Sequence, residues 1–139
     1  MKLALIKDGK VEAIELPKEH DYRDIKKLLE IDSPIDCIER KIGGKWFDLW
    51  IDDEGALKDD DEITAVTFTN DGYACEFLLG RVLIAHHDSE GYTTGLSDDE
   101  IKLVKENLKK DMLLSGCGAE WVGKVRYIRK DGKFLMLRV

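Results

Sequence analysis

Short apolar runs separated by glycine-containing turns restrict what this chain can fold into. Asp8-Gly9 has the residue types of a two-residue type I′ hairpin turn, and Gly43-Gly44 and Asp131-Gly132 stand at similar places between apolar runs. Residues 35–42 alternate between the two sides of an extended chain, as a strand does. Gly80 interrupts the most apolar stretch and predicts a bulge or a tight bend between two strands. The pattern therefore predicts mostly antiparallel strands.

The first of two helical patterns follows Asp21, a residue type that caps helix N-termini. Ile25, Leu28 and Leu29 then recur at the spacing of one helix face. Ser33-Pro34 is expected to stop this helix, because the residue before a proline avoids the helical region.

The second helical pattern covers residues 97–110. Ser97, with Glu100 three residues later, forms a capping box. Ile101, Val104 and Leu108 form the apolar stripe that should be buried. Together the patterns predict an α+β fold, with a single mostly antiparallel β-sheet, two helices packed on it and a C-terminal β-hairpin.

Charge divides the chain unevenly, although its length of 139 residues predicts one domain over 1–139. The net charge is −7, with 16 basic and 27 acidic residues in 1–112 but six basic and two acidic in 113–139. An acidic body would repel a phosphate backbone, so we do not expect nucleic-acid binding. The apolar runs are far shorter than the roughly 20 residues that span a bilayer, and no secretory leader is evident, so we expect no membrane partner and a cytoplasmic protein.

Three cysteines, Cys37, Cys75 and Cys117, are widely spaced and odd in number. This excludes a disulfide framework and argues against a structural zinc site. Cys37 and Cys75 lie in strand-like runs, where a free cysteine commonly serves as a small hydrophobe. We expect no cofactor and no metal.

His86, His87 and Asp88 at the end of an apolar run are the residues that most suggest chemistry. Neighbouring side chains of a strand point to opposite faces, so the two histidines cannot easily share one metal ion. No nucleophile motif accompanies them, so the catalytic role left open is general acid–base work. The simpler interpretation is a strand that ends in a turn at Asp88 and Gly91. We assign no catalytic residue.

Two further segments allow a functional interpretation. Residues 48–62 hold eight acidic residues against one lysine, but they miss the calcium-loop spacing; DNA mimicry and a solvated loop both remain open. The basic residues after 113 interleave with aromatic residues, a pattern that permits base stacking but also docking on an acidic surface. The candidate ligand- or partner-binding residues are His86, His87, Asp88, Tyr92, Lys124, Arg126 and Tyr127.

Three stretches of the chain carry a resemblance to a known family. They read, in order, YRDIKKLLEIDSPIDCIERKIGGKWFDLWIDDEGALKDD, LLGRVLIAHHDSEG and GLSDDEIKLVKENL. In them the chain resembles the domain of unknown function 3846 family, which is common in phages and other bacterial mobile elements. The resemblance covers roughly residues 1–110 and implies a small accessory protein; the basic hairpin lies beyond it.

The leading hypothesis is a non-enzymatic accessory protein that binds a host protein or a small signalling ligand, in order to counter a host defence. A homo-oligomer is compatible with this hypothesis. One alternative is a small nucleotide-handling hydrolase that uses His86, His87 and Asp88. The other is an acidic DNA mimic that inhibits a DNA-binding protein.

Overall fold

The structure is a computed structural model that describes residues 1–7, 10–55, 62–68, 75–107, 119–120, 125–130 and 133–138. Side chains are described for 1–7, 10–55, 78 and 80–107. In chain order the elements are β1 (Lys2–Lys7), β2 (Lys10–Glu15), α1 (Tyr22–Leu29), β3 (Ile35–Ile42), β4 (Lys45–Asp52), β5 (Glu62–Phe68), β6 (Cys75–Leu79), β7 (Val82–His87), β8 (Thr93–Thr94), α2 (Asp98–Glu106), β9 (Ala119–Glu120), β10 (Val125–Lys130) and β11 (Lys133–Arg138).

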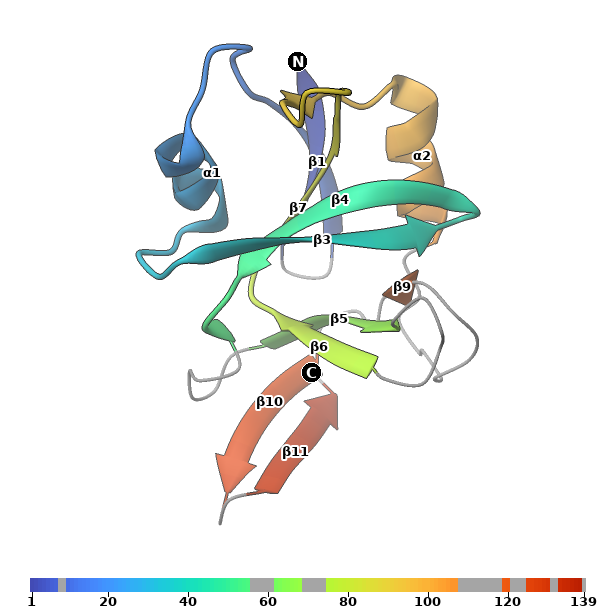
Figure 1. The fold of residues 1–139 in the computed structure, drawn as a ribbon. Helices are drawn as coiled ribbons and strands as arrows, with labels where there is room; N and C mark the ends of the chain where they lie inside the picture. Colours follow the sequence, from blue (N-terminus) through green and yellow to red (C-terminus); the bar gives the residue numbers. More distant parts are fainter. Residues whose placement is uncertain are drawn as a thin grey trace.

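The main sheet is antiparallel and has the strand order β2-β1-β7-β4-β3, with β8 paired to the end of β7. The central strand β7 is far in sequence from both of its neighbours, β1 and β4. Helices α1 and α2 lie on opposite sides of the strands (Figure 1). The predicted α+β fold, an antiparallel sheet with two helices packed on it, is confirmed.

A second sheet has the order β11-β10-β5-β6, with β9 paired to β5. Strands β10 and β11 pair from Val125 with Arg138 to Lys130 with Lys133, which is the register of the predicted C-terminal hairpin. The turn at 131–132 lies outside the described residues. Leu78 of β6 is buried in the core beneath the main sheet, so this sheet adds to that core.

Two apolar layers, one on each face of the main sheet, form the core. The layer under α1 contains Leu3, Leu5, Leu16, Ile25, Leu29, Leu83 and Ala85. The layer under α2 contains Ala4, Ile6, Ile42, Phe47, Leu49, Leu78, Val82, Ile84, Leu96, Ile101 and Val104. Strand β7 is buried on both faces, because its alternate residues contribute to both layers.

Helix α1 begins as the sequence predicts. The Asp21 carboxylate accepts the backbone N–H of Arg23, and the Asp24 side chain accepts the N–H of Asp21 in return. Ile25 and Leu29 are buried. The helix ends earlier than the Ser33-Pro34 stop, because Glu30 adopts a left-handed conformation with φ of 55°.

Helix α2 also has its predicted capping box. The Ser97 hydroxyl accepts the N–H of Glu100, and the Glu100 carboxylate accepts the N–H of Ser97. Ile101 and Val104 are buried, as predicted, while Leu108 lies outside the described residues. Neither described helix is long and apolar enough to cross a membrane.

The predicted turns account for the strand pairings. Ile42 pairs with Lys45 across Gly43-Gly44, and both glycines have positive φ, as a type I′ turn requires. Gly80, with φ of 74°, separates β6 from β7. Lys7 pairs with Lys10, the register of a two-residue turn, although the turn at 8–9 lies outside the described residues.

Candidate functional site

The two adjacent histidines at the end of β7 point to opposite faces of the main sheet. His86 packs on the α2 side, where its ring stacks on Phe47 with centroids 5.0 Å apart. His87 lies on the α1 side and contacts Asp48 and Glu39. The structure therefore separates the pair that the sequence places together, and gives each histidine its own carboxylate.

His86 connects strand β7 to the start of α2. Its Nε2 is hydrogen-bonded to the Glu100 carboxylate, which also accepts Lys45 Nζ at 3.2 Å. Glu100 is the capping-box residue of α2, so one carboxylate holds the helix N-terminus, a β4 lysine and the β7 histidine. Burial opposes ionisation of Glu100, but hydrogen bonds from His86, Ser97 and Lys45 outweigh it and lower the pKa of Glu100 to about 2.

His87 contacts two carboxylates on the other face of the sheet. Its Nδ1 lies 2.7 Å from Oδ2 of Asp48, and its Nε2 lies 3.9 Å from Oε1 of Glu39. Because a carboxylate can only accept, Nδ1 carries the hydrogen. The hydrogen bond to Asp48, together with the charge of that carboxylate, raises the pKa of His87. This favours an imidazolium that is aimed outward by a buried acid.

Asp48 is the one buried charged residue among the side chains that the structure describes. Its side chain is 9% exposed, whereas those of His87 and Glu39 are 48% and 62% exposed. Asp48 stands between Phe47 and Leu49, both buried, in the middle of β4. A charge is placed here at a cost, since desolvating a carboxylate is unfavourable unless it is paired.

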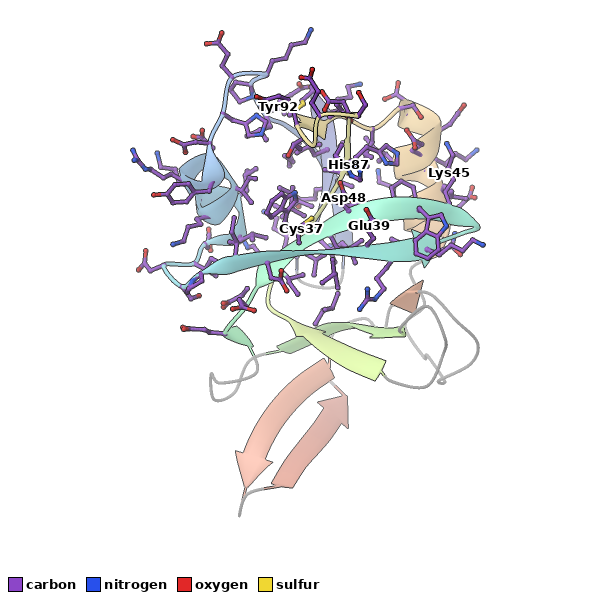
Figure 2. All side chains as sticks on the ribbon, in the orientation of Figure 1. Cys37, Glu39, Lys45, Asp48, His87 and Tyr92 are labelled. Carbon is purple, nitrogen blue, oxygen red and sulfur yellow. The ribbon has the colours of Figure 1, made fainter. Side chains whose placement is uncertain are left out.

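The strand register arranges a continuous surface around this pair. Glu39 of β3 pairs with Asp48 of β4, and Lys41 pairs with Trp46 two residues further along the same strands. Lys41 Nζ lies 5.9 Å from the centre of the Trp46 ring, and Trp46 is 48% exposed. Figure 2 shows Glu39, Asp48 and His87 grouped on this side of the sheet. We call Glu39, Lys41, Trp46, Asp48 and His87 the His87 surface.

Cys37 lies next to the His87 surface on β3, two residues before Glu39 (Figure 2). It is free, and the residue is exposed. Desolvation of the sulfur and then the charge of Asp48 raise the pKa of the Cys37 thiol to about 12. The thiol is therefore protonated at neutral pH and is a poor nucleophile.

Asp88 and Tyr92, two other predicted binding residues, form the hairpin after β7. Asp88 Oδ1 accepts the backbone N–H groups of Glu90 and Tyr92, and Gly91 has φ of 86°. This agrees with the interpretation of a strand that ends in a turn. Tyr92 is exposed and lies apart from the His87–Asp48 pair in Figure 2.

A cavity of about 500 Å³ lies on the exposed side of α1. Its lining residues are Tyr22, Arg23, Lys26, Lys27, Glu30, Ile31 and Asp32. Three of these are cations, and the guanidinium of Arg23 lies 5.6 Å from the centre of the Tyr22 ring. Glu30 and Asp32 offset part of the positive charge, and the cavity does not include the His87 surface.

The remaining predicted binding residues belong to the C-terminal segment. Lys124 lies outside the described residues, and Arg126 and Tyr127 are described only by their place in β10. Residues 56–61 of the acidic segment 48–62 are also outside them. In its described part, Asp48 is buried and Asp52 accepts the Ser33 hydroxyl at 2.6 Å.

Sequence reasoning missed Asp48 and Glu39 as partners of His87, because they come from strands about 40 residues earlier. One signal was present in KWFDLWID, where Asp48 shares a strand face with Trp46 and Trp50. A charged residue between two tryptophans on one strand face indicates either a solvated strand or a buried acid. The pairing of β4 with β7, which decides between them, is not local in sequence.

Comparison with known proteins places the chain in a family. Searches among curated proteins and among solved structures find no match. A family model, described as a domain of unknown function (DUF3846), matches residues 1–109, which span the main sheet and both helices. The chain belongs to the DUF3846 family.

Proposed function

We propose that this protein is a non-enzymatic binding protein that docks a partner protein on the His87 surface. The observation that carries the proposal is the buried Asp48 hydrogen-bonded to the half-exposed His87. A buried carboxylate whose only described partner is an exposed side chain adds little to stability. It does, however, fix the direction of a hydrogen-bond donor at the surface.

The composition of the His87 surface supports a protein partner. Trp46 is exposed beside charged groups of both signs, and exposed tryptophans are frequent centres of binding energy in protein interfaces. Glu39 and Lys41 would form a polar rim around Trp46 and His87. The surface lies on strands rather than on loops, so its groups are held in place before binding.

We further propose the biological setting that the family resemblance implies. The protein would be an accessory protein of a phage or mobile element, acting in the host cytoplasm. Its partner would be a host protein, and occupying that partner would blunt a defence system. The resemblance to a family common in phages and other mobile elements supports this setting.

A small signalling ligand is a second candidate, and the α1 cavity favours it. Its volume of about 500 Å³ falls within the range of small-molecule sites, roughly 300–1,000 Å³. Arg23, Lys26 and Lys27 would attract an anionic ligand, and Tyr22 offers a ring for stacking. This site shares no residue with the His87 surface, so the two candidates are separable by mutation.

A hydrolase and a DNA mimic receive less support. The Asp48–His87 pair has the arrangement of a general base and its orienting acid. It lies on an open sheet face, however, where water is not excluded from a reaction. A DNA mimic needs exposed carboxylates; Asp53 and Glu54 are exposed, but Asp48 is buried and paired with His87.

Affinity capture with two surface variants tests the proposal. Tagged wild-type protein, a Trp46→Ala/His87→Gln double variant and a Tyr22→Ala/His20→Gln control would be incubated with host lysate. Bound proteins and small molecules would be quantified by mass spectrometry. We expect the double variant to lose a protein that the wild type and the control both retain. Equal protein capture by all three, or loss only in the control, would contradict docking on the His87 surface.

A further inference from the structure

We propose that His87 and Glu39 bind a divalent first-row transition-metal ion, with Asp48 holding the His87 ring in position. This inference uses the same surface as the proposed function. It needs no partner protein, so the isolated chain can test it. The expectation of no metal weighed the cysteines, the acidic segment 48–62 and the adjacent histidines, but not these three residues, which come from β3, β4 and β7.

The His87 ring is already arranged as a metal ligand. The hydrogen bond from Nδ1 to Asp48, at 2.7 Å, fixes the proton on that nitrogen. Nε2 is the other ring nitrogen and does not contact Asp48, and a metal ion would bind it by displacing the proton that it carries in the imidazolium. Histidine ligands in metal sites characteristically donate their other ring nitrogen to a carboxylate, which fixes the tautomer and the ring orientation. Asp48 is buried, so it is an orienting group that cannot swing away.

Glu39 provides the facing donor. Its Oε1 lies 3.9 Å from Nε2 of His87, and one donor atom from each of Glu39, Asp48 and His87 lies within 4.8 Å of the others. Ligand bonds to zinc are about 2.0–2.2 Å, so two ligands of one ion stand about 3–4 Å apart. The Glu39 side chain is exposed and free to adjust by that small amount. The ion would keep open positions for water or for a donor from a bound molecule.

The donor types select the class of metal. One imidazole nitrogen together with the Glu39 carboxylate suits zinc, manganese and cobalt, whereas magnesium and calcium prefer oxygen ligands alone. Two carboxylates also balance the charge of a divalent ion. Lys41 is the nearby cation, and it lies over the Trp46 ring instead of pairing with Glu39. The neighbouring Cys37 thiol is not required by this arrangement.

Isothermal titration of Zn²⁺ into the purified full chain tests the site. We expect one ion per chain, with at least a tenfold loss of affinity in His87→Gln and in Glu39→Gln. Asp48→Asn should weaken binding by about 10- to 100-fold, as the loss of an orienting group does. The matched controls His20→Gln and Glu12→Gln, placed away from the site, should bind as the wild type does. Circular dichroism would confirm that every variant is folded.

A Co²⁺ absorption spectrum identifies the donors independently of affinity. Nitrogen and oxygen ligands give only weak visible bands, whereas thiolate ligation adds an intense charge-transfer band. We expect weak bands that differ from those of aqueous Co²⁺, unchanged in Cys37→Ser and replaced by the aqueous spectrum in His87→Gln. Wild-type affinity for Zn²⁺ no higher than that of His87→Gln, or a charge-transfer band that Cys37→Ser removes, would overturn the proposal. Either result leaves the partner-capture experiment to be decided separately.

Discussion

Replacing Asp48 by valine separates a functional carboxylate from a structural one. If Asp48 serves binding, an apolar residue of similar size should be tolerated by the fold, although binding would be lost. If Asp48 serves folding, its removal should destabilise the protein. The position suits this test, because Asp48 is buried between Phe47 and Leu49 while its partner His87 is half-exposed.

The contributions to the free energy of unfolding can be set side by side. Losing the charge-assisted hydrogen bond to His87 costs about 1.5–3 kcal/mol. Burying a valine side chain in its place returns about 1.5–3 kcal/mol, and the desolvation penalty of the carboxylate is also removed. Removing one partner of a buried pair is normally costly because the other charge stays buried. Here His87 is 48% exposed and can be hydrated. We therefore expect Asp48→Val to be neutral or up to about 2 kcal/mol more stable than the wild type.

Urea denaturation followed by circular dichroism measures this difference. Leu49→Ala, one residue along the same strand and fully buried, is the matched control and should cost about 2–5 kcal/mol. It shows that the assay detects damage to β4. A loss of more than 2 kcal/mol in Asp48→Val would refute the reasoning, because Asp48 would then stabilise the fold itself.

Three other predictions test the structure around this site. Glu100→Gln should lower the free energy of unfolding by about 1–2 kcal/mol at pH 7. This magnitude allows for solvent screening of Lys45 and His86, the partly exposed partners of Glu100. Since the folded pKa of Glu100 is lowered to about 2, the difference from wild type should be full above pH 4.5 and shrink as pH falls toward 2 in urea titrations. Gly43→Ala should lower the free energy of unfolding by about 1–3 kcal/mol in thermal denaturation, because φ is +59° and a Cβ would lie 2.7 Å from the side chain of Leu103 in α2. Gly44→Ala is the control and should cost less, because the space around Gly44 is open. Cys37 should react with iodoacetamide at pH 7.5 more slowly than free cysteine, measured by peptide mass spectrometry, because its thiol pKa is about 12.

Local patterns were sufficient for the elements of this fold. Asp21 and Ser97 cap the helices as predicted, because capping depends on residues within one turn. The glycine turns set the hairpin registers for the same reason. The order of strands in the sheet was not predictable, since β7 inserts between β1 and β4 through contacts that no local pattern encodes. The same holds for the second sheet, which brings β10 beside β5.

The sequence predicted the placement of the two histidines but not the partners of His87. Strand alternation correctly separated His86 from His87, because successive side chains face opposite ways. The partners of His87 were not predictable, since Asp48 and Glu39 reach it through the β3–β4–β7 pairing. The sequence directed attention to Asp88, the nearest acid, which instead binds the backbone of its own turn.

The two histidines show how one strand end can serve two purposes. On the α2 face, His86 is enclosed by Phe47 and the capping carboxylate Glu100, so its hydrogen bond joins elements that must pack together. On the α1 face, His87 joins nothing that the apolar layer does not already hold, because its carboxylate partners belong to β4 and β3 of the same sheet. A polar contact that adds no new connection to the fold, yet requires a buried charge, is best explained by what it presents to the outside. That difference is the reason for assigning His86 to stability and His87 to binding.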